Sequence, residues 1–360
     1  MTFDEARAQF PVLDRVAYLN AGSMGPVARA TADAMAERAR LDLEHGRSGK
    51  PYYDEMQRLR AAVRERLASL VGSDASHLAL TTSTTNGCNI VVGGLELGPD
   101  DEVVTTDAEH PGLLAPLHVS GAKIVVAATT GRPADEAFSV LLDAVTPHTK
   151  LLALSHVAWT TGQVFPIHEL KRETGLPVLV DGAQSVGAIP VEAGEIDFYT
   201  VSCQKWLCGP DALGGLYVRD PSSLRIAAPT YFSVQTIEVD GAFAPRDGAQ
   251  RFDCGWLGVP SLAGLVAALD LAPEWRFERA ADAAARCRGL LAETGIEVVT
   301  EAAQSTLVSF VPPRDAEETV TRALEADVVI RMLPGKGWCR VSCGWWTSDE
   351  DLERLVAAVA

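Results

Sequence analysis

The stretch Pro177-Val-Leu-Val-Asp181-Gly-Ala-Gln184 is a short apolar run that ends in a carboxylate. An uninterrupted apolar run is typical of a strand that is buried on both faces of a sheet. In α/β proteins, ligand groups lie at the carboxyl ends of such parallel strands. We therefore expect Asp181 at the ligand-binding edge of a parallel sheet, although an Asp here could instead cap the following helix.

Similar β-rich runs alternate with amphipathic segments from about residue 78 to 218. The runs are His77–Thr82, Glu102–Thr106, Lys123–Ala127, Leu151–His156, Pro177–Asp181, Phe198–Ser202 and Gly214–Val218. Asp135–Val145 and Ile167–Thr174 have helical spacing between them. This rhythm predicts an α/β fold with a mostly parallel seven-stranded sheet and helices on both faces.

The segments outside this block predict long helices, one irregular connection and an α+β tail. The helices are Val27–Glu44, Tyr53–Val71, Pro260–Ala272 and Glu274–Thr294, and the irregular stretch is Asp220–Gln250. The tail alternates strands (Glu297–Val299, Leu307–Val311, Cys339–Ser342) with helices (Ala316–Ala326, Ser348–Ala358). We expect three parts: an N-terminal segment (1–17) packed on the small domain, a large domain (18–264) and a small C-terminal domain (265–360).

Composition excludes several classes of function. The 360 residues are 47% hydrophobic, which suffices for packed cores, and the net charge of −17 disfavours nucleic acid and anionic membranes as partners. No apolar run is long enough to span a bilayer, and the start, MTFDEARAQF, does not resemble a signal peptide. Seven cysteines without metal-ligand spacing predict reduced thiols in a cytoplasmic protein and no metal site.

Five consecutive hydroxyl residues, Thr81-Thr82-Ser83-Thr84-Thr85, leave one strand and enter the apolar helix Cys88–Leu95. Hydroxyls and free N–H groups at a helix N-terminus form a seat for phosphate. Plain capping of the helix is the alternative, but it requires only one such residue. Neither a P-loop nor a Gly-rich dinucleotide fingerprint is present, so a nucleotide site is not indicated.

Lys205 lies in Val201-Ser-Cys-Gln-Lys205-Trp-Leu-Cys, directly after a predicted strand. The chain has only six lysines, and this one has apolar neighbours. Burial there would lower the pKa of the amine and leave it neutral and nucleophilic. A lysine that extends to the surface is the more frequent alternative.

Arg340, in Trp338-Cys-Arg340-Val-Ser, lies on a predicted strand and is suited to bind a carboxylate through two hydrogen bonds. The alternative is a solvent-exposed arginine on an edge strand. Together, a buried lysine, a carboxylate, a phosphate seat and a carboxylate-binding arginine describe a pyridoxal phosphate (PLP) site that acts on an amino acid.

With these motifs, the chain resembles the class V aminotransferase-like proteins of fold type I, from Tyr18-Leu-Asn-Ala-Gly22 to the tail. This family includes cysteine desulfurases, isopenicillin N epimerase-like proteins and cystine C–S lyases. The resemblance implies that Lys205 forms the covalent bond to PLP, that Asp181 faces the pyridine nitrogen, and that His110 stacks on the ring. It further places Gln184 near the ring oxygen. It also implies contacts to the phosphate and to the substrate: Thr84, Thr85, Ser202 and Gln204 for the phosphate, Arg340 and Trp159 for the substrate.

Differences from the family pattern bear on the reaction. Gln204 replaces the usual His before the lysine, and Trp159 replaces the Asn of desulfurases, as in the C–S lyase and epimerase-like branch. Gly255-Trp256 stands where many relatives direct a Gly-Thr to the partner subunit's phosphate. Group II desulfurases have a persulfide-forming Cys on a loop before the carboxylate-binding arginine, and Glu325–Trp338 contains none.

We therefore expect a cytoplasmic, homodimeric PLP enzyme that catalyses β-elimination from a cysteine-derived amino acid. Aminotransfer and epimerisation are the alternatives, because the same residues serve all three, and a catalytically silent PLP-binding scaffold is the alternative of another class. Six of the seven tryptophans lie in or beside the motifs, and we hypothesise that they line an apolar substrate cleft. These are Trp159, Trp206, Trp256, Trp338, Trp345 and Trp346.

Overall fold

The central sheet of the computed structural model, which describes residues 1–360, has the strand order β2-β8-β7-β6-β5-β3-β4. Its strands are β2 (Leu78–Thr81), β3 (Glu102–Thr106), β4 (Lys123–Ala127), β5 (Thr149–Ser155), β6 (Val178–Asp181), β7 (Phe198–Ser202) and β8 (Gly214–Val218). Only β8 runs antiparallel to its neighbours, β2 and β7. The predicted α/β fold with a mostly parallel seven-stranded sheet is confirmed.

Both faces of this sheet are buried, which explains the continuous apolar runs. In β5, Leu151 and Ala153 belong to one core cluster, whereas Leu152 and Leu154 belong to the cluster on the other face. The helices that line the sheet divide in the same way. The first face packs against α4 (Thr84–Gly94) and α5 (Pro111–His118), and the second against α3 (Gly49–Leu70), α6 (Ala134–Asp143), α7 (Ile167–Thr174) and α8 (Val259–Leu271).

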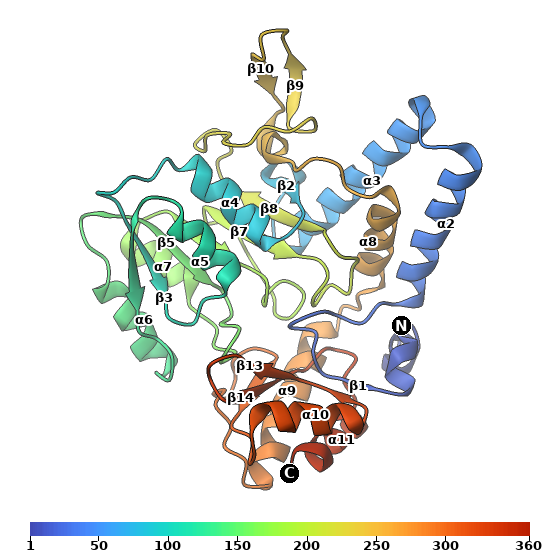
Figure 1. The fold of residues 1–360 in the computed structure, drawn as a ribbon, viewed down its shortest axis with the longest axis vertical. Helices are drawn as coiled ribbons and strands as arrows, with labels where there is room; N and C mark the ends of the chain where they lie inside the picture. Colours follow the sequence, from blue (N-terminus) through green and yellow to red (C-terminus); the bar gives the residue numbers. More distant parts are fainter.

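A smaller antiparallel sheet lies in the C-terminal part, orange and red in Figure 1, with the order β11-β14-β13. Its strands are β11 (Leu307–Phe310), β13 (Arg331–Leu333) and β14 (Trp338–Ser342), and its helices are α9 (Arg276–Glu293), α10 (Ala316–Glu325) and α11 (Asp349–Val359). The sequence pattern of the tail predicted this α+β arrangement, and the structure confirms it. No helix of the structure has both the length and the apolar character to cross a membrane.

The N-terminal residues pack on the small domain. Helix α1 (Phe3–Arg7) is held there by the ion pair of Arg7 with Asp351, and β1 (Ala17–Tyr18) pairs with β12 (Val328–Val329). Helix α8 packs on α2 (Arg29–His45) and α3 within the large domain. The division at 1–17, 18–264 and 265–360 stays a prediction, and these contacts favour a second boundary after α8, at Ala272–Trp275.

Two local predictions are wrong. The stretch Asp220–Gln250, predicted to be irregular, contains the hairpin β9 (Val234–Ile237) and β10 (Phe243–Pro245), which projects from the large domain in Figure 1. The hairpin is exposed, so no apolar alternation marks it. Glu297–Val299 forms only an isolated bridge between Val298 and Phe310, because the N–H groups of Val299 and Thr300 both donate to the carbonyl of Ser309 and interrupt the regular ladder.

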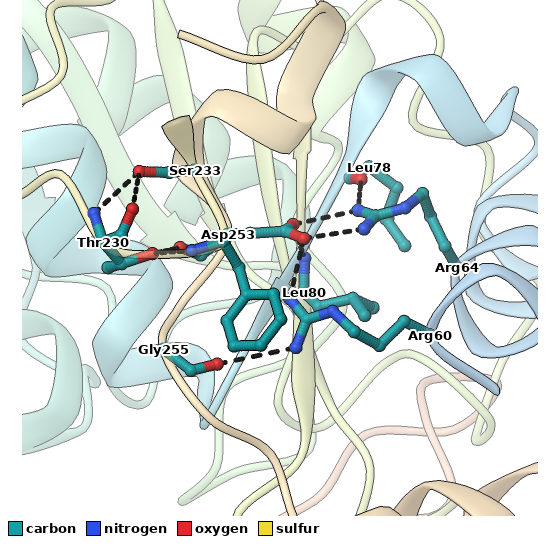
Figure 2. Close-up of polar contacts among 9 residues, drawn as sticks. Arg60, Arg64, Leu78, Leu80, Thr230, Ser233, Asp253 and Gly255 are labelled. Atoms are coloured by element: carbon teal, nitrogen blue, oxygen red, sulfur yellow. Dashed lines mark hydrogen bonds and ion pairs between the residues drawn. The ribbon is translucent and has the colours of Figure 1, made fainter. Parts of the chain in front are cut away.

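A buried ion cluster fixes the outer edge of β2, as Figure 2 shows. Asp253 accepts hydrogen bonds from Arg60 (2.8 Å) and Arg64 (2.7 Å) of α3 and from the backbone N–H of Leu80 (2.9 Å). The N–H of Cys254 also donates to the carbonyl of Leu80. Strand β2 therefore has no free edge, and the start of the hydroxyl run that follows it is held in place.

We predict that Asp253→Ala lowers the free energy of unfolding by about 3–5 kcal/mol, because two guanidinium groups stay buried without their carboxylate. Urea denaturation monitored by circular dichroism measures this change. The control is Asp54→Ala, which removes an exposed pair with Lys50 and should cost less than about 1 kcal/mol. Equal small losses in both variants would contradict the role of the cluster.

Candidate active site

A cavity of about 210 Å³ lies between the carboxyl ends of the central strands and the small domain's β13 and β14. Every predicted site residue except Asp181 lines it. These residues are Thr84, Thr85, His110, Trp159, Gln184, Ser202, Gln204, Lys205 and Arg340. Asp181 is buried beside it at the end of β6, where its side chain accepts a hydrogen bond from the N–H of Ala183, a lining residue.

Lys205 follows β7 on a tight turn. The N–H of Gly25 donates to the carbonyl of Gln204 (2.8 Å), and a Cβ atom at Gly25 would lie only 2.0 Å from the carbonyl oxygen of Lys205. Only glycine permits this approach. Burial lowers the pKa of Lys205 to about 8, opposed by Asp181 and reinforced by Arg340 and Arg331. The amine is therefore partly neutral near physiological pH, as a nucleophile requires.

The last two residues of the hydroxyl run, Thr84 and Thr85, lie in the first turn of α4, which begins at Thr84 and not at Cys88 as predicted. Ser83 is the N-cap, and its hydroxyl accepts from the N–H of Asn86 (3.1 Å). Ser83 thus supplies the capping side chain, and the side-chain hydroxyls of Thr84 and Thr85 make no protein hydrogen bond while they line the cavity. Two free hydroxyls at a helix N-terminus are suited to an anion.

His110 caps α5 and faces the cavity at the same time. Its Nδ1 accepts from the N–H of Gly112 (3.0 Å), and its ring meets Trp159 edge-on with the centroids 5.4 Å apart. Burial and the nearby Lys205 lower the pKa of His110. The imidazole is therefore neutral at pH 7, which suits a ring that packs on another aromatic ring.

Arg340 is fully buried and lacks an acidic partner. Its Nη1 donates to the carbonyl of Trp159 (2.7 Å), whereas Nε and Nη2 have no hydrogen-bond partner. Gly22 leaves the space in front of it open, because a Cβ there would lie 2.8 Å from Nη2 of Arg340. A buried guanidinium with free donors requires an anion to offset its desolvation, and a carboxylate matches its geometry.

Arg331 is a site residue that the sequence did not reveal. It lies directly opposite Arg340 in the β13–β14 register, donates to the hydroxyl of Ser23 (2.9 Å) and approaches the ring of Trp159 (5.7 Å). It forms no ion pair either. Val329, Arg331 and Leu333 stand at alternate positions, which is the spacing of one face of a strand. The strand β13 has only three residues, however, so this spacing does not identify it in the sequence.

Glu109 is the second missed residue. Its carboxyl group is buried and accepts hydrogen bonds from the hydroxyl of Thr106 (2.7 Å) and from the N–H (3.0 Å) and hydroxyl (2.6 Å) of Ser155. Ser155 is paired with Asp181 across β5 and β6. Burial raises the pKa of Glu109 to about 7. The carboxyl group of Glu109 thus connects the segment that carries His110 to β5, the strand next to Asp181.

The tryptophan hypothesis is wrong except for Trp159, the one tryptophan that lines the cavity. Trp345 and Trp346 are buried and pack around Phe10 of the N-terminal segment. Trp206 is also buried and donates to the side chain of Gln184 (3.0 Å). Phe10 of the N-terminal segment, which packs on the small domain, explains why Trp345 and Trp346 point away from the cavity.

The residues present fit PLP. The free hydroxyls of Thr84 and Thr85 at a helix N-terminus match a phosphate, and the partly neutral amine of Lys205 matches an aldehyde. The buried carboxylate of Asp181 matches a protonated ring nitrogen. The unpartnered Arg340 matches the carboxylate of an amino acid that reacts there.

Comparisons with known proteins agree with this fit. The family model described as aminotransferase class-V matches residues 28–355. An isopenicillin N epimerase from Streptomyces clavuligerus is 28% identical over 99% of this chain and 97% of that protein. The cysteine desulfurase CsdA from Escherichia coli (strain K12) is 29% identical over 76% of this chain and 72% of its own length.

Solved structures extend the similarity to the whole fold. The cystine C–S lyase C-DES, in complex with its reaction product cysteine persulfide, superimposes with a TM-score of 0.91 at 29% identity, covering 98% of this chain and 99% of that chain. A C-DES variant with glycine covalently linked to its PLP cofactor matches equally well, with a TM-score of 0.91 at 28% identity and 98% coverage of both chains.

We predict that covalent loading of the cofactor-free protein with PLP speeds up with rising pH, with a midpoint near 8. The reason is that only the neutral amine of Lys205 attacks an aldehyde, and its pKa is lowered to about 8. Stopped-flow absorbance measures the rate. Arg340→Gln removes a nearby cation and should move the midpoint upward, whereas Arg58→Gln, on the exposed face of α3, should not. A midpoint near 10.5 in the unaltered protein would show that Lys205 is solvated.

Proposed function

Because the chain belongs to the aminotransferase class-V family, whose members depend on PLP, we propose that it is a C–S lyase that acts on a cysteine-derived amino acid by β-elimination. The observation that carries this proposal is the pair of arginines without acidic partners, Arg340 and Arg331, in a cavity that no cysteine lines. The similarity to the cystine C–S lyase supports it.

Desulfuration by a cysteine of the protein is disfavoured. All seven cysteines are buried, and the turn between β13 and β14, Pro334–Gly337, has none. Burial raises the pKa of Cys339, the neighbour of Arg340, to about 12. No thiolate is therefore available to accept sulfur from a substrate.

The binding roles follow from the geometry. Thr84, Thr85, Ser202 and Gln204 would hold the phosphate, His110 would cover one face of the ring, and Gln184 would lie at its oxygen. Asp181 would keep a proton on the ring nitrogen. Bound PLP supplies the sink for the electron pair left at Cα. Arg340 would bind the α-carboxylate and thereby orient the Cα–H bond.

Lys205 would perform the proton transfer. Its neutral amine accepts the proton from Cα, and the Cβ–S bond then breaks with its electron pair leaving on sulfur. Hydrolysis of the remaining three-carbon fragment gives pyruvate and ammonia. Arg331 is positioned to bind a second carboxylate, so we propose that the preferred substrate carries one on the sulfur side, as a disulfide-linked amino acid does.

Aminotransfer and epimerisation are the alternatives, since the same groups remove the Cα proton in each. The similarity to isopenicillin N epimerases favours the second. A silent scaffold is disfavoured, because it would gain nothing from Arg340, a fully buried cation without an acidic partner, which costs stability.

We further propose a homodimer in the cytoplasm. Tyr53, Tyr231 and Trp256 form an exposed aromatic patch, with Tyr231 and Trp256 stacked at 6.3 Å and 69% and 57% exposed. An exposed patch of this kind is typical of an interface between proteins. The seven unpaired cysteines suit a reducing compartment.

We predict that the loaded enzyme releases pyruvate from cystine without any 2-oxo acid, measured with a coupled lactate dehydrogenase assay. Lys205→Ala should lower the rate by about 10³-fold or more. Arg340→Gln should lower kcat/KM by about 10²-fold, because it removes a charged, buried hydrogen-bond donor. Amino-group transfer that requires a 2-oxo acid, or formation of a D-amino acid without pyruvate, would overturn the lyase assignment.

We predict that analytical ultracentrifugation gives twice the chain mass of 38.3 kDa. Trp256→Glu should shift the mass towards the monomer, because it buries a charge in the proposed interface. Leu324→Glu, an equally exposed apolar position on α10, is the control and should leave the dimer intact. A monomeric unaltered protein would refute the proposed assembly.

A further inference from the structure

A second cavity, of about 190 Å³, lies behind the segment that follows Lys205 and shares no lining residue with the first. Trp206, Leu207 and Cys208 form the wall nearest the active site. The other walls come from α3 and α8 of the large domain and from Phe10, Arg276 and Trp345 at the small domain. The cavity therefore lies at the junction of the two domains.

Its size and lining suit a small ligand with one ring. A dry cavity of about 150 Å³ lined by apolar side chains is large enough to bind benzene. This cavity is slightly larger, and most of its lining is apolar, with Leu269, Leu271 and Trp345 among the residues. An aromatic ring with a short polar substituent matches that volume.

The charges around the cavity determine the substituent. Two arginines line it, and no acidic residue does. Arg66 is paired with Asp270 at 2.7 Å, but Arg276 forms no ion pair and donates only to the carbonyl of Pro273. The Nε of Arg276 is buried without a partner, and burial lowers its pKa. A guanidinium in this state is stabilised by an anion.

Arg276 is the first residue of α9, and its backbone N–H donates to the carbonyl of Pro273, as one of its guanidinium nitrogens also does. The guanidinium is therefore the group that makes one side of the cavity positive. An apolar ring at one end and a carboxylate at the other is the complementary ligand.

We propose that this cavity is a binding site for a small aromatic or similarly compact apolar monocarboxylate, with Arg276 as its carboxylate-binding residue. The cavity wall connects the ligand to the active site. Trp206 donates to Gln184, and the N–H of Cys208 donates to the carbonyl of Lys205 (3.1 Å). Gly187, at φ +89°, supports this wall so closely that a Cβ would lie 2.8 Å from Leu207. The bound ligand thus holds the Lys205 segment in one position.

The test uses the PLP-loaded enzyme and phenylacetate as the probe. Trp206 and Trp345 line the cavity, so tryptophan fluorescence reports on its occupation. For a ligand of about ten heavy atoms we expect a Kd of about 0.1–1 mM. Arg276→Gln should raise the Kd for phenylacetate by about tenfold or more. Phenylacetamide has no charge, so its Kd for the unaltered enzyme should be raised by a similar factor. Ala272→Phe fills the cavity and should abolish binding.

Phenylacetate could also occupy the active site through Arg340, so Arg340→Gln serves as the matched control. Binding that survives Arg340→Gln and is lost in Arg276→Gln supports the second cavity, whatever reaction the enzyme catalyses. Binding that is lost in Arg340→Gln and kept in Arg276→Gln overturns it, as does the absence of any fluorescence change up to about 10 mM. If phenylacetate in the second cavity acts on the Lys205 segment, its binding to the PLP-loaded Arg340→Gln enzyme should shift the PLP absorbance band.

Discussion

The active-site cavity depends on an imbalance of buried charge. Lys205, Arg331 and Arg340 converge on it, and neither arginine has an acidic partner. Each buried cation costs free energy unless an anion compensates for its lost hydration. In the proposed complex, a phosphate and a substrate carboxylate would supply that compensation. Burial lowers the pKa of Lys205 to about 8, and Arg340 and Arg331 reinforce the shift against the opposing charge of Asp181. The same cations would therefore bind the anionic groups and help to keep the amine neutral.

Both domains contribute charged residues to the cavity. The central sheet places Asp181 and Lys205 at the ends of adjacent strands, and the buried Asp253 cluster holds the edge strand from which the hydroxyl run leaves. The small domain brings Arg331 and Arg340 on paired strands. Since the two halves of the site come from different domains, the junction behind Lys205 determines their relative position. The cavity at that junction is where a second ligand can act.

Much of the fold could be predicted from the sequence, since strands buried on both faces leave continuous apolar runs. For this reason β3, β7 and β8 have the predicted bounds, and β4, an edge strand that is partly exposed, has them as well. The start of α4 was predicted too late, because a hydroxyl run can cap a helix or enter it, and only the structure shows that Ser83 is the cap. The places of Arg331 and Glu109 in the site could not be predicted, because they depend on partners that are distant in the sequence, Ser23 and Ser155. Trp345 and Trp346 were misassigned because proximity to a motif in sequence does not determine which face of a segment points to the cavity.

All of these proposed roles depend on a covalent bond between Lys205 and PLP. Borohydride reduction of the loaded enzyme, followed by proteolysis and peptide mass spectrometry, tests this bond. We expect one pyridoxyl group per chain, on the peptide that contains Lys205, and none on the other five lysines. A label on another lysine, or a reduced protein without any label, would contradict it.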